Sequence, residues 1–154
     1  MRKLLTGLVL VLVLATLGAI GAQANGGHSS HDKGRVHQVT VPEADRFTPF
    51  AVQIRAGDSV KWVNNDEDDH TVVSDDAFNT AGNRGTNDLL PVDGSVVLRF
   101  RHPGTFVYYC RFHAHLDADS QPVAPGPDGG IQDANGNFGT PMSGVITVLP
   151  RDDH

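Results

Sequence analysis

Short segments in which apolar and polar side chains alternate recur between residues 36 and 149, and turn residues separate them. In residues 105–110 the alternation places Phe106, Tyr108 and Cys110 on one face, and Pro103-Gly104 before them is a turn signal. The chain has no convincing helical period and no internal repeat. The pattern therefore predicts an all-β, antiparallel β-sandwich in a single domain. Strands are expected at residues 36–41, 50–54, 59–64, 70–74, 95–101, 105–110 and 143–149.

The N-terminal segment has the features of a signal peptide. Arg2 and Lys3 form a basic start, an apolar run follows, and Ala22-Gln23-Ala24 fits the usual cleavage pattern. An uncleaved membrane anchor is the alternative, because the apolar run is close to the length that a bilayer requires. We predict a signal peptide at residues 1–24 and a flexible tail rich in His, Gly and Ser at residues 25–35. The protein is then periplasmic or secreted, without stable membrane insertion after cleavage.

The exported part of the chain carries a strongly negative charge. The whole chain has 12 Lys and Arg against 18 Asp and Glu, and cleavage would remove Arg2 and Lys3. The remaining formal charge, 10 − 18, is −8. This balance disfavours a nucleic-acid partner, because phosphate binding needs a basic face. It favours a redox protein partner with a basic docking patch.

Cys110 is the only cysteine, so an exported chain of this kind cannot form an internal disulfide, and the thiol needs another explanation. His113 follows at C-x-x-H spacing, Met142 precedes the last predicted strand, and His70 ends an acidic run. A thiolate, two imidazoles and a weak thioether form the ligand set of a blue copper electron-transfer centre. Two simpler interpretations stay open: Cys110 as a small buried hydrophobic residue, and Met142 as core filler.

Four pieces of the sequence, in this order, resemble the cupredoxin family, and most of all its plastocyanin and pseudoazurin branch. The pieces are AGDSVKWVNND, DDHTVVSDD, HPGTFVYYCRFH and MSGVITV, between about Val36 and Leu149. The resemblance implies a Greek-key, cupredoxin-like sandwich at residues 36–150 with one copper ion in a type 1 site. It also implies that the metal ligands are His70, Cys110, His113 and Met142.

The chain departs from the pattern of that family in three places. Between His113 and Met142 stand 28 residues where the family usually has few, so residues 114–141 are interpreted as an insertion before the last strand. His115 has the spacing of the azurin branch and is a rival ligand to His113. Thr71 stands where the family often has an asparagine that braces the thiolate loop.

The resemblance implies an electron carrier rather than an enzyme. As a monomer, it would cycle one copper ion between Cu(I) and Cu(II) and exchange electrons with extracytoplasmic redox partners. Two other classes stay open: a copper carrier or storage protein, and an enzyme of the red-copper kind with an open coordination position. The insertion is rich in Gly, Pro, Asp and Asn, so we expect it to add little to the core and to form a rim at the copper end.

Overall fold

The computed structural model describes residues 34–74 and 86–151, all within the compact unit His31–His154. The predicted signal peptide and residues 25–33 of the predicted tail lie outside the described residues. Within the described ranges no helix is long and apolar enough to cross a membrane.

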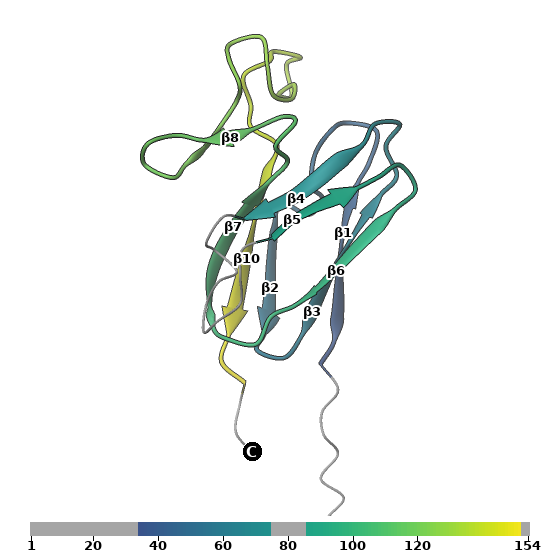
Figure 1. The fold of residues 1–154 in the computed structure, drawn as a ribbon, viewed down its shortest axis with the longest axis vertical. Coiled ribbons are helices and arrows are strands. Elements are labelled where there is room, and N and C mark those ends of the chain that lie inside the picture. The colour runs from purple at the N-terminus through teal and green to yellow at the C-terminus, as the bar shows by residue number, and fades with distance from the viewer. Residues whose placement is uncertain (1–33, 75–85, 152–154) are drawn as a thin grey trace, which may run out of the picture. The chain divides into compact units, whose positions relative to one another are not determined.

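In the described part of the chain, ten strands form three sheets; Figure 1 shows their arrangement. A three-stranded sheet has the order β1-β3-β6, a five-stranded sheet has the order β2-β10-β7-β4-β5, and β8 pairs with β9. The first two sheets form the sandwich, so the predicted all-β fold is confirmed. The strands are β1 (Val36–Val41), β2 (Ala51–Arg55), β3 (Ser59–Asn64), β4 (His70–Ser74), β5 (Thr86–Leu90), β6 (Ser95–Arg99), β7 (Gly104–Tyr109), β8 (His115–Leu116), β9 (Pro122–Val123) and β10 (Ser143–Leu149).

Two of the strand pairings are parallel, which the expectation of purely antiparallel pairing did not include. β1 pairs with β3 and β2 pairs with β10 in parallel, while the other pairings are antiparallel. The reason is the path of the chain, since β1, β2 and β3 alternate between the two main sheets. A chain that crosses between sheets at each turn brings alternate strands back in the same direction.

The strand β5 was not predicted from the sequence. Its residues TNDLL include polar side chains at its first three positions, so the alternation of apolar residues is weak. β5 lies at the edge of the five-stranded sheet, next to β4. Polar residues suit an edge strand because they discourage pairing with another chain.

Alternate side chains of each main strand point into one core, as the period of two predicts. Tyr108 lies at its centre: its ring centroid is 5.3 Å from that of Trp62 and 4.8 Å from that of Phe47, both in edge-to-face geometry. Such pairs add about 0.5–1.5 kcal/mol each beyond the buried area. Tyr108 also packs on the backbone of β10, because a Cβ at Gly144 would lie 2.4 Å from the tyrosine ring. Only glycine fits there.

Residues 114–141 form an extended loop at one end of the sandwich, where Figure 1 shows β8. Its turns are held by carboxylates: Asp117 Oδ1 accepts two backbone N–H bonds and Asp133 Oδ1 accepts two more. Within the loop, all of which the structure describes, only Ala114 and Ile131 are buried. Ile131 joins the main core cluster, so the insertion contributes one side chain to the core.

Candidate metal centre

Three strand ends meet near the insertion and bring the predicted site residues together. His70 begins β4, Cys110 follows the end of β7, and Met142 precedes β10. Backbone hydrogen bonds join Cys110, Met142 and His113: Cys110 N–H donates to the Met142 carbonyl at 3.0 Å, and Met142 N–H donates to the His113 carbonyl at 3.4 Å. His113 N–H donates to the Cys110 carbonyl at 3.0 Å, which closes a tight turn. The loop is thus fixed on both sides by β7 and β10.

Donor atoms of His70, Cys110 and His113 all lie within 4.8 Å of one another. The Nδ1 atom of His70 is 3.8 Å from the sulfur of Cys110, and the centroids of the two imidazole rings are 5.4 Å apart. His70 and Cys110 have no exposed surface, whereas His113 is half-buried. One thiol and two imidazoles therefore converge on a small, shielded space.

The surroundings of Cys110 favour its thiolate form. Burial raises the pKa of the thiol, but the nearby rings of His113 and His70 and hydrogen bonds from the backbone N–H groups of Phe112 and Thr71 outweigh burial and lower the pKa to about 5. The thiolate is the form that binds a metal. Cys110 is thus prepared as a ligand before any metal arrives.

The two histidines respond to the same thiolate. The nearby Cys110 thiolate raises the pKa of His113 against the effect of burial. Burial lowers the pKa of His70, but the hydrogen bond and the charge of Cys110 outweigh burial and raise the pKa. The Nδ1 atom of His113 is buried without a hydrogen-bond partner. A lone pair left unsatisfied beside a thiolate fits a soft or borderline metal ion.

Thr71 braces Cys110 from the neighbouring strand. Its backbone N–H donates to the Cys110 sulfur at 3.4 Å, and its hydroxyl donates to the same sulfur at 3.7 Å. The hydroxyl oxygen accepts the backbone N–H of Arg111 at 2.9 Å. One threonine side chain thus contacts both the sulfur and the backbone of the loop that carries it, where the resemblance led us to look for an asparagine.

Met142 and His115 differ sharply in their surroundings. Met142 is fully buried, in the same core cluster as Cys110. His115 lies on β8 and is exposed, and it is not part of the group of converging donor atoms. Of the two rival histidines, His113 is the one beside Cys110.

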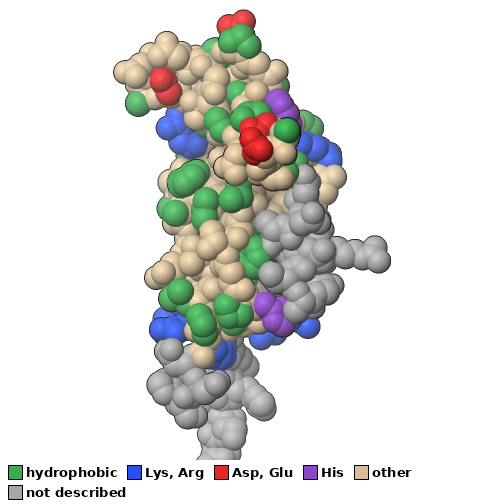
Figure 2. Space-filling view, turned by 90° about the vertical axis from the view of Figure 1, so that its left-hand side faces the viewer, with side chains coloured by type: hydrophobic (Ala, Val, Ile, Leu, Met, Phe, Trp, Pro, Cys, Tyr) green, Lys and Arg blue, Asp and Glu red, His purple; other side chains and the backbone are tan. Residues whose placement is uncertain are grey.

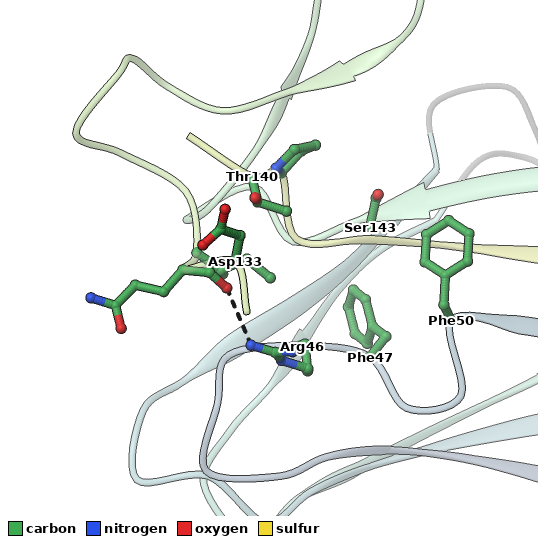
Figure 3. A pocket seen from close by; sticks show the side chains of 9 residues that line it. Arg46, Phe47, Phe50, Asp133, Thr140 and Ser143 are labelled. Carbon is green, nitrogen blue, oxygen red and sulfur yellow. Dashed lines mark hydrogen bonds between the residues drawn. The ribbon is translucent and has the colours of Figure 1, made fainter. Parts of the chain in front are cut away.

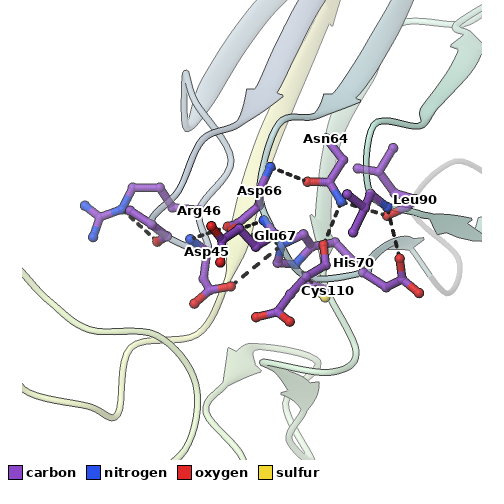
Figure 4. Close-up of polar contacts among 12 residues, drawn as sticks. Asp45, Arg46, Asn64, Asp66, Glu67, His70, Leu90 and Cys110 are labelled. Carbon is purple, nitrogen blue, oxygen red and sulfur yellow. Dashed lines mark hydrogen bonds and ion pairs between the residues drawn. The ribbon is translucent and has the colours of Figure 1, made fainter.

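Sequence reasoning missed two carboxylates on the far side of His70 (Figure 4). The Nε2 atom of His70 is 3.5 Å from Asp66 Oδ2 and 3.7 Å from Asp45 Oδ1. The i,i+4 spacing of Asp66 and His70 in the run DEDDH was the available signal for one of them. Nothing in the sequence indicated Asp45, which comes from the segment before β2.

A shallow hollow opens beside His113. It is lined by Glu67, Asp68, Asp69, Val92, Phe112 and His113, with a volume of about 580 Å³. Phe112 and Val92 are exposed apolar residues at its rim. In Figure 2, which shows another face, the visible acidic side chains gather toward the end of the molecule that carries the insertion.

A second hollow of about 420 Å³ separates the insertion from the segment before β2 (Figure 3). Phe47 and Phe50 line it from one side, and Asp133 and Thr140 from the other. Arg46 spans the two sides, because its guanidinium donates to the carbonyl of Gln132 at 3.2 Å. None of the converging donor atoms belongs to this hollow, and the hydrogen bond from Arg46 links the insertion to the segment before β2.

A buried thiolate between two imidazoles at the end of a β-sandwich defines a mononuclear site for a soft or borderline metal. Residues 36–118, over half of the chain, match the family described as copper binding proteins, plastocyanin/azurin family. The chain belongs to this family: it is a copper-binding protein of the electron-transfer type, and its cofactor is one copper ion. Met142 lies beyond the matched residues.

Solved structures of copper proteins are similar to this chain at low sequence identity. A purple cupredoxin from Nitrosopumilus maritimus is 20% identical over 73% of this chain and 98% of that chain, with a TM-score of 0.47. Amicyanin from Paracoccus versutus is 19% identical over 77% and 83%, with a TM-score of 0.47. A methionine-to-glutamine mutant of amicyanin in the Cu(I) state is 16% identical over 74% and 82%, with a TM-score of 0.50.

Proposed function

We propose that this protein carries single electrons between redox partners outside the cytoplasm, with copper held by His70, Cys110, His113 and Met142. The observation that carries the proposal is the fully buried Cys110 sulfur, which lies 3.8 Å from the Nδ1 atom of His70 and within 4.8 Å of a ring nitrogen of His113. Copper supplies the Cu(II)/Cu(I) couple when bound. The residues keep the same donors fixed in both oxidation states, which keeps the reorganisation cost of electron transfer small.

The thioether of Met142 is the proposed weak fourth ligand. Its support is the full burial of Met142 and the pair of backbone hydrogen bonds that tie it to Cys110 and His113. A thioether stabilises Cu(I) more than a harder ligand would. It therefore raises the reduction potential of the copper. The donor set is filled by these four residues, which argues for a carrier rather than an enzyme with an open position.

The half-buried edge of His113 is the proposed point of electron exit, because it faces the hollow that opens to solvent. The rim of the hollow combines the carboxylates of Glu67, Asp68 and Asp69 with an exposed Phe112. An exposed phenylalanine surrounded by carboxylates suits a protein partner whose docking surface is basic. Replacing both Asp68 and Asp69 by Asn should slow reduction by a cationic redox reagent and flatten its salt dependence, while replacing both by Glu should preserve the rates.

The proposed location rests on residues 1–24, whose basic start, apolar run and small residues fit a cleaved signal. The mass and N-terminal sequence of the exported protein test this step. A mature chain that starts at Asn25 supports it, and a membrane-bound chain that still carries its apolar run contradicts it.

The decisive experiment is to add Cu(II) to the purified chain and record visible and EPR spectra and a voltammogram. An intense thiolate-to-copper band, a narrow copper hyperfine splitting and a reversible one-electron couple support the proposal. Cys110→Ser should remove the band while the sandwich still unfolds cooperatively. A colourless Cu(II) complex would favour a copper carrier or store, and a band that shifts when azide or imidazole is added to the unmodified protein would favour an open enzyme site.

A further inference from the structure

Two carboxylates lie behind His70, on the side of the ring that faces away from Cys110 (Figure 4). His70 is fully buried, and its Nε2 atom lies 3.5 Å from Asp66 and 3.7 Å from Asp45. The side chain of Asp66 is 8% exposed and that of Asp45 is 40% exposed. One imidazole thus faces a thiolate through one nitrogen and a pair of carboxylates through the other.

The chain holds both carboxylates in place through local turns. Asp66 Oδ1 accepts the N–H of Glu67 at 2.7 Å, and Asp66 Oδ2 accepts the N–H of Asp45 at 3.1 Å. The N–H of Asp66 itself donates to Asn64 Oδ1 at 3.0 Å. Asp45 has a φ of 50°, a left-handed conformation that aspartate tolerates better than most residues. The cluster is therefore built by the backbone and is not an accident of surface side chains.

Two polar atoms in this cluster are buried without a hydrogen-bond partner: Nε2 of His70 and Oδ1 of Asp45. The spacings of 3.5 and 3.7 Å from Nε2 to the two carboxylates are too long for good hydrogen bonds. An Nε2–H group would lie next to both carboxylates, whose charges attract its proton although neither oxygen is at the distance of a good hydrogen bond. Each oxygen of Asp66 already accepts one backbone N–H group, which weakens that oxygen as a ligand for a second cation but leaves it one lone pair.

We propose that Asp66 and Asp45 are positioning residues that act on copper through His70. They draw the proton of the ring to Nε2, against the Cys110 thiolate that draws it to Nδ1, and so leave the Nδ1 lone pair free for the metal. Their negative charge stabilises Cu(II) relative to Cu(I), which lowers the reduction potential against the effect of the Met142 thioether. This inference rests on the proposed ligation of copper by His70.

The test compares Asp45→Asn and Asp66→Asn with Glu43→Gln in the copper-loaded protein. Glu43 is an exposed carboxylate two residues before Asp45, so the control makes the same change in net charge where water screens it. Asn keeps the left-handed backbone at residue 45, so Asp45→Asn should fold even if Asp66→Asn does not. We expect each Asn variant to weaken Cu(II) binding relative to Cu(I) binding by about threefold to tenfold. A tenfold change raises the potential of a one-electron couple by about 59 mV.

A second readout needs no metal. Long-range ¹H–¹⁵N NMR of the copper-free Cys110→Ala variant at about pH 8, in which no thiolate draws the proton to Nδ1, should show His70 as the Nε2–H tautomer, and adding both Asn changes should remove this preference. Potentials that match the Glu43→Gln control, or an Nδ1–H tautomer in Cys110→Ala, would overturn the proposal. Stoichiometric Zn²⁺ binding to the copper-loaded protein that Asp45→Asn abolishes would also overturn it, since the pair would then be a second metal site. If the unmodified protein never develops the thiolate band, the proposed function fails; if the band is present and only the potentials are unmoved, this inference alone fails.

Discussion

The hydroxyl of Thr71 donates to the sulfur of Cys110 at 3.7 Å from a strand that is 39 residues away in sequence, and the backbone N–H of Thr71 donates to the same sulfur at 3.4 Å. The same hydroxyl accepts the N–H of Arg111. A single side chain of β4 therefore fixes the position of the sulfur and withdraws negative charge from it. This contact makes Thr71 the first target for testing how the sandwich controls the copper.

Thr71→Val should lower the reduction potential of the copper protein and shift its thiolate band. Valine keeps the shape of threonine, but it removes a hydrogen bond to the sulfur, which leaves a more electron-rich thiolate and favours Cu(II). The N–H of Arg111 loses its acceptor as well, at a cost of about 1–2 kcal/mol in the free energy of unfolding. Voltammetry and thermal unfolding measure the two effects. Thr71→Ser keeps the hydroxyl, so its reduction potential and its free energy of unfolding should both stay close to those of the unmodified protein. If the serine variant behaves like the valine variant, the hydroxyl is not the cause of the changes.

His113→Ala and His115→Ala should have opposite outcomes. The first removes a converging donor at the edge of the site, so the intense band should vanish or return only with added imidazole. The second removes an exposed side chain of β8 and should leave the visible and EPR spectra nearly unchanged. The reverse pattern would mean that the loop rearranges on binding copper to the spacing of the azurin branch.

Met142→Leu should keep the colour and raise the reduction potential. Leucine fills a similar volume, so the folding cost should stay below about 1.5 kcal/mol. It removes the thioether, and an apolar axial neighbour disfavours Cu(II) further. Voltammetry of the two proteins under the same buffer conditions measures the difference. An unchanged potential would leave Met142 as core filler.

Asp58→Asn should destabilise the protein in a manner that depends on pH. Asp58 accepts the N–H groups of Arg35 at 2.8 Å and Arg55 at 3.0 Å, and it lies 3.1 Å from His37 Nε2. Burial raises its pKa, but these hydrogen bonds outweigh burial and lower the pKa below the ordinary value of 3.8. A carboxyl whose pKa is lower in the folded state stabilises the fold above its unfolded pKa, and this contribution is lost as pH falls through the folded pKa.

The difference in unfolding free energy between the unmodified protein and Asp58→Asn should therefore be about 2 kcal/mol near neutral pH. It should shrink as the pH falls below about 4, because the carboxyl then becomes protonated. Urea unfolding of the copper-free protein at a series of pH values measures this curve. If this difference in unfolding free energy grew as the pH fell, the lowered pKa of Asp58 in the folded protein would be wrong.

Ile131→Ala should destabilise the protein although residue 131 belongs to the insertion. Its side chain is 7% exposed and packs in the cluster that contains Met142 and Cys110. Removing it should cost about 2–4 kcal/mol in unfolding free energy. Val123→Ala, at a half-buried position of β9, is the matched control and should cost clearly less. If Ile131→Ala and Val123→Ala both lost only a small and equal amount of unfolding free energy, the insertion would not contribute to the core.

Much of the sandwich could be predicted because strand alternation is a local property. Side chains of a strand alternate between two faces whatever its partners are, so residues 59–64 and 143–149 were delimited correctly from their own pattern. β5 was missed because an edge strand needs no clear alternation. The parallel pairing of β2 with β10 was missed because pairing depends on the path of the chain between sheets.

The sequence by itself determined which chemical groups are available: one thiol, a histidine three residues later and one methionine before the last strand. Tertiary structure alone decided which of these atoms converge. It placed His113 beside Cys110 and left His115 exposed, and it brought Thr71 to the sulfur and Asp45 to the far side of His70. The physical reason is that a metal site is defined by distances of a few ångströms between residues tens of positions apart. Those distances are fixed by packing between strands, and no local pattern in the chain encodes them.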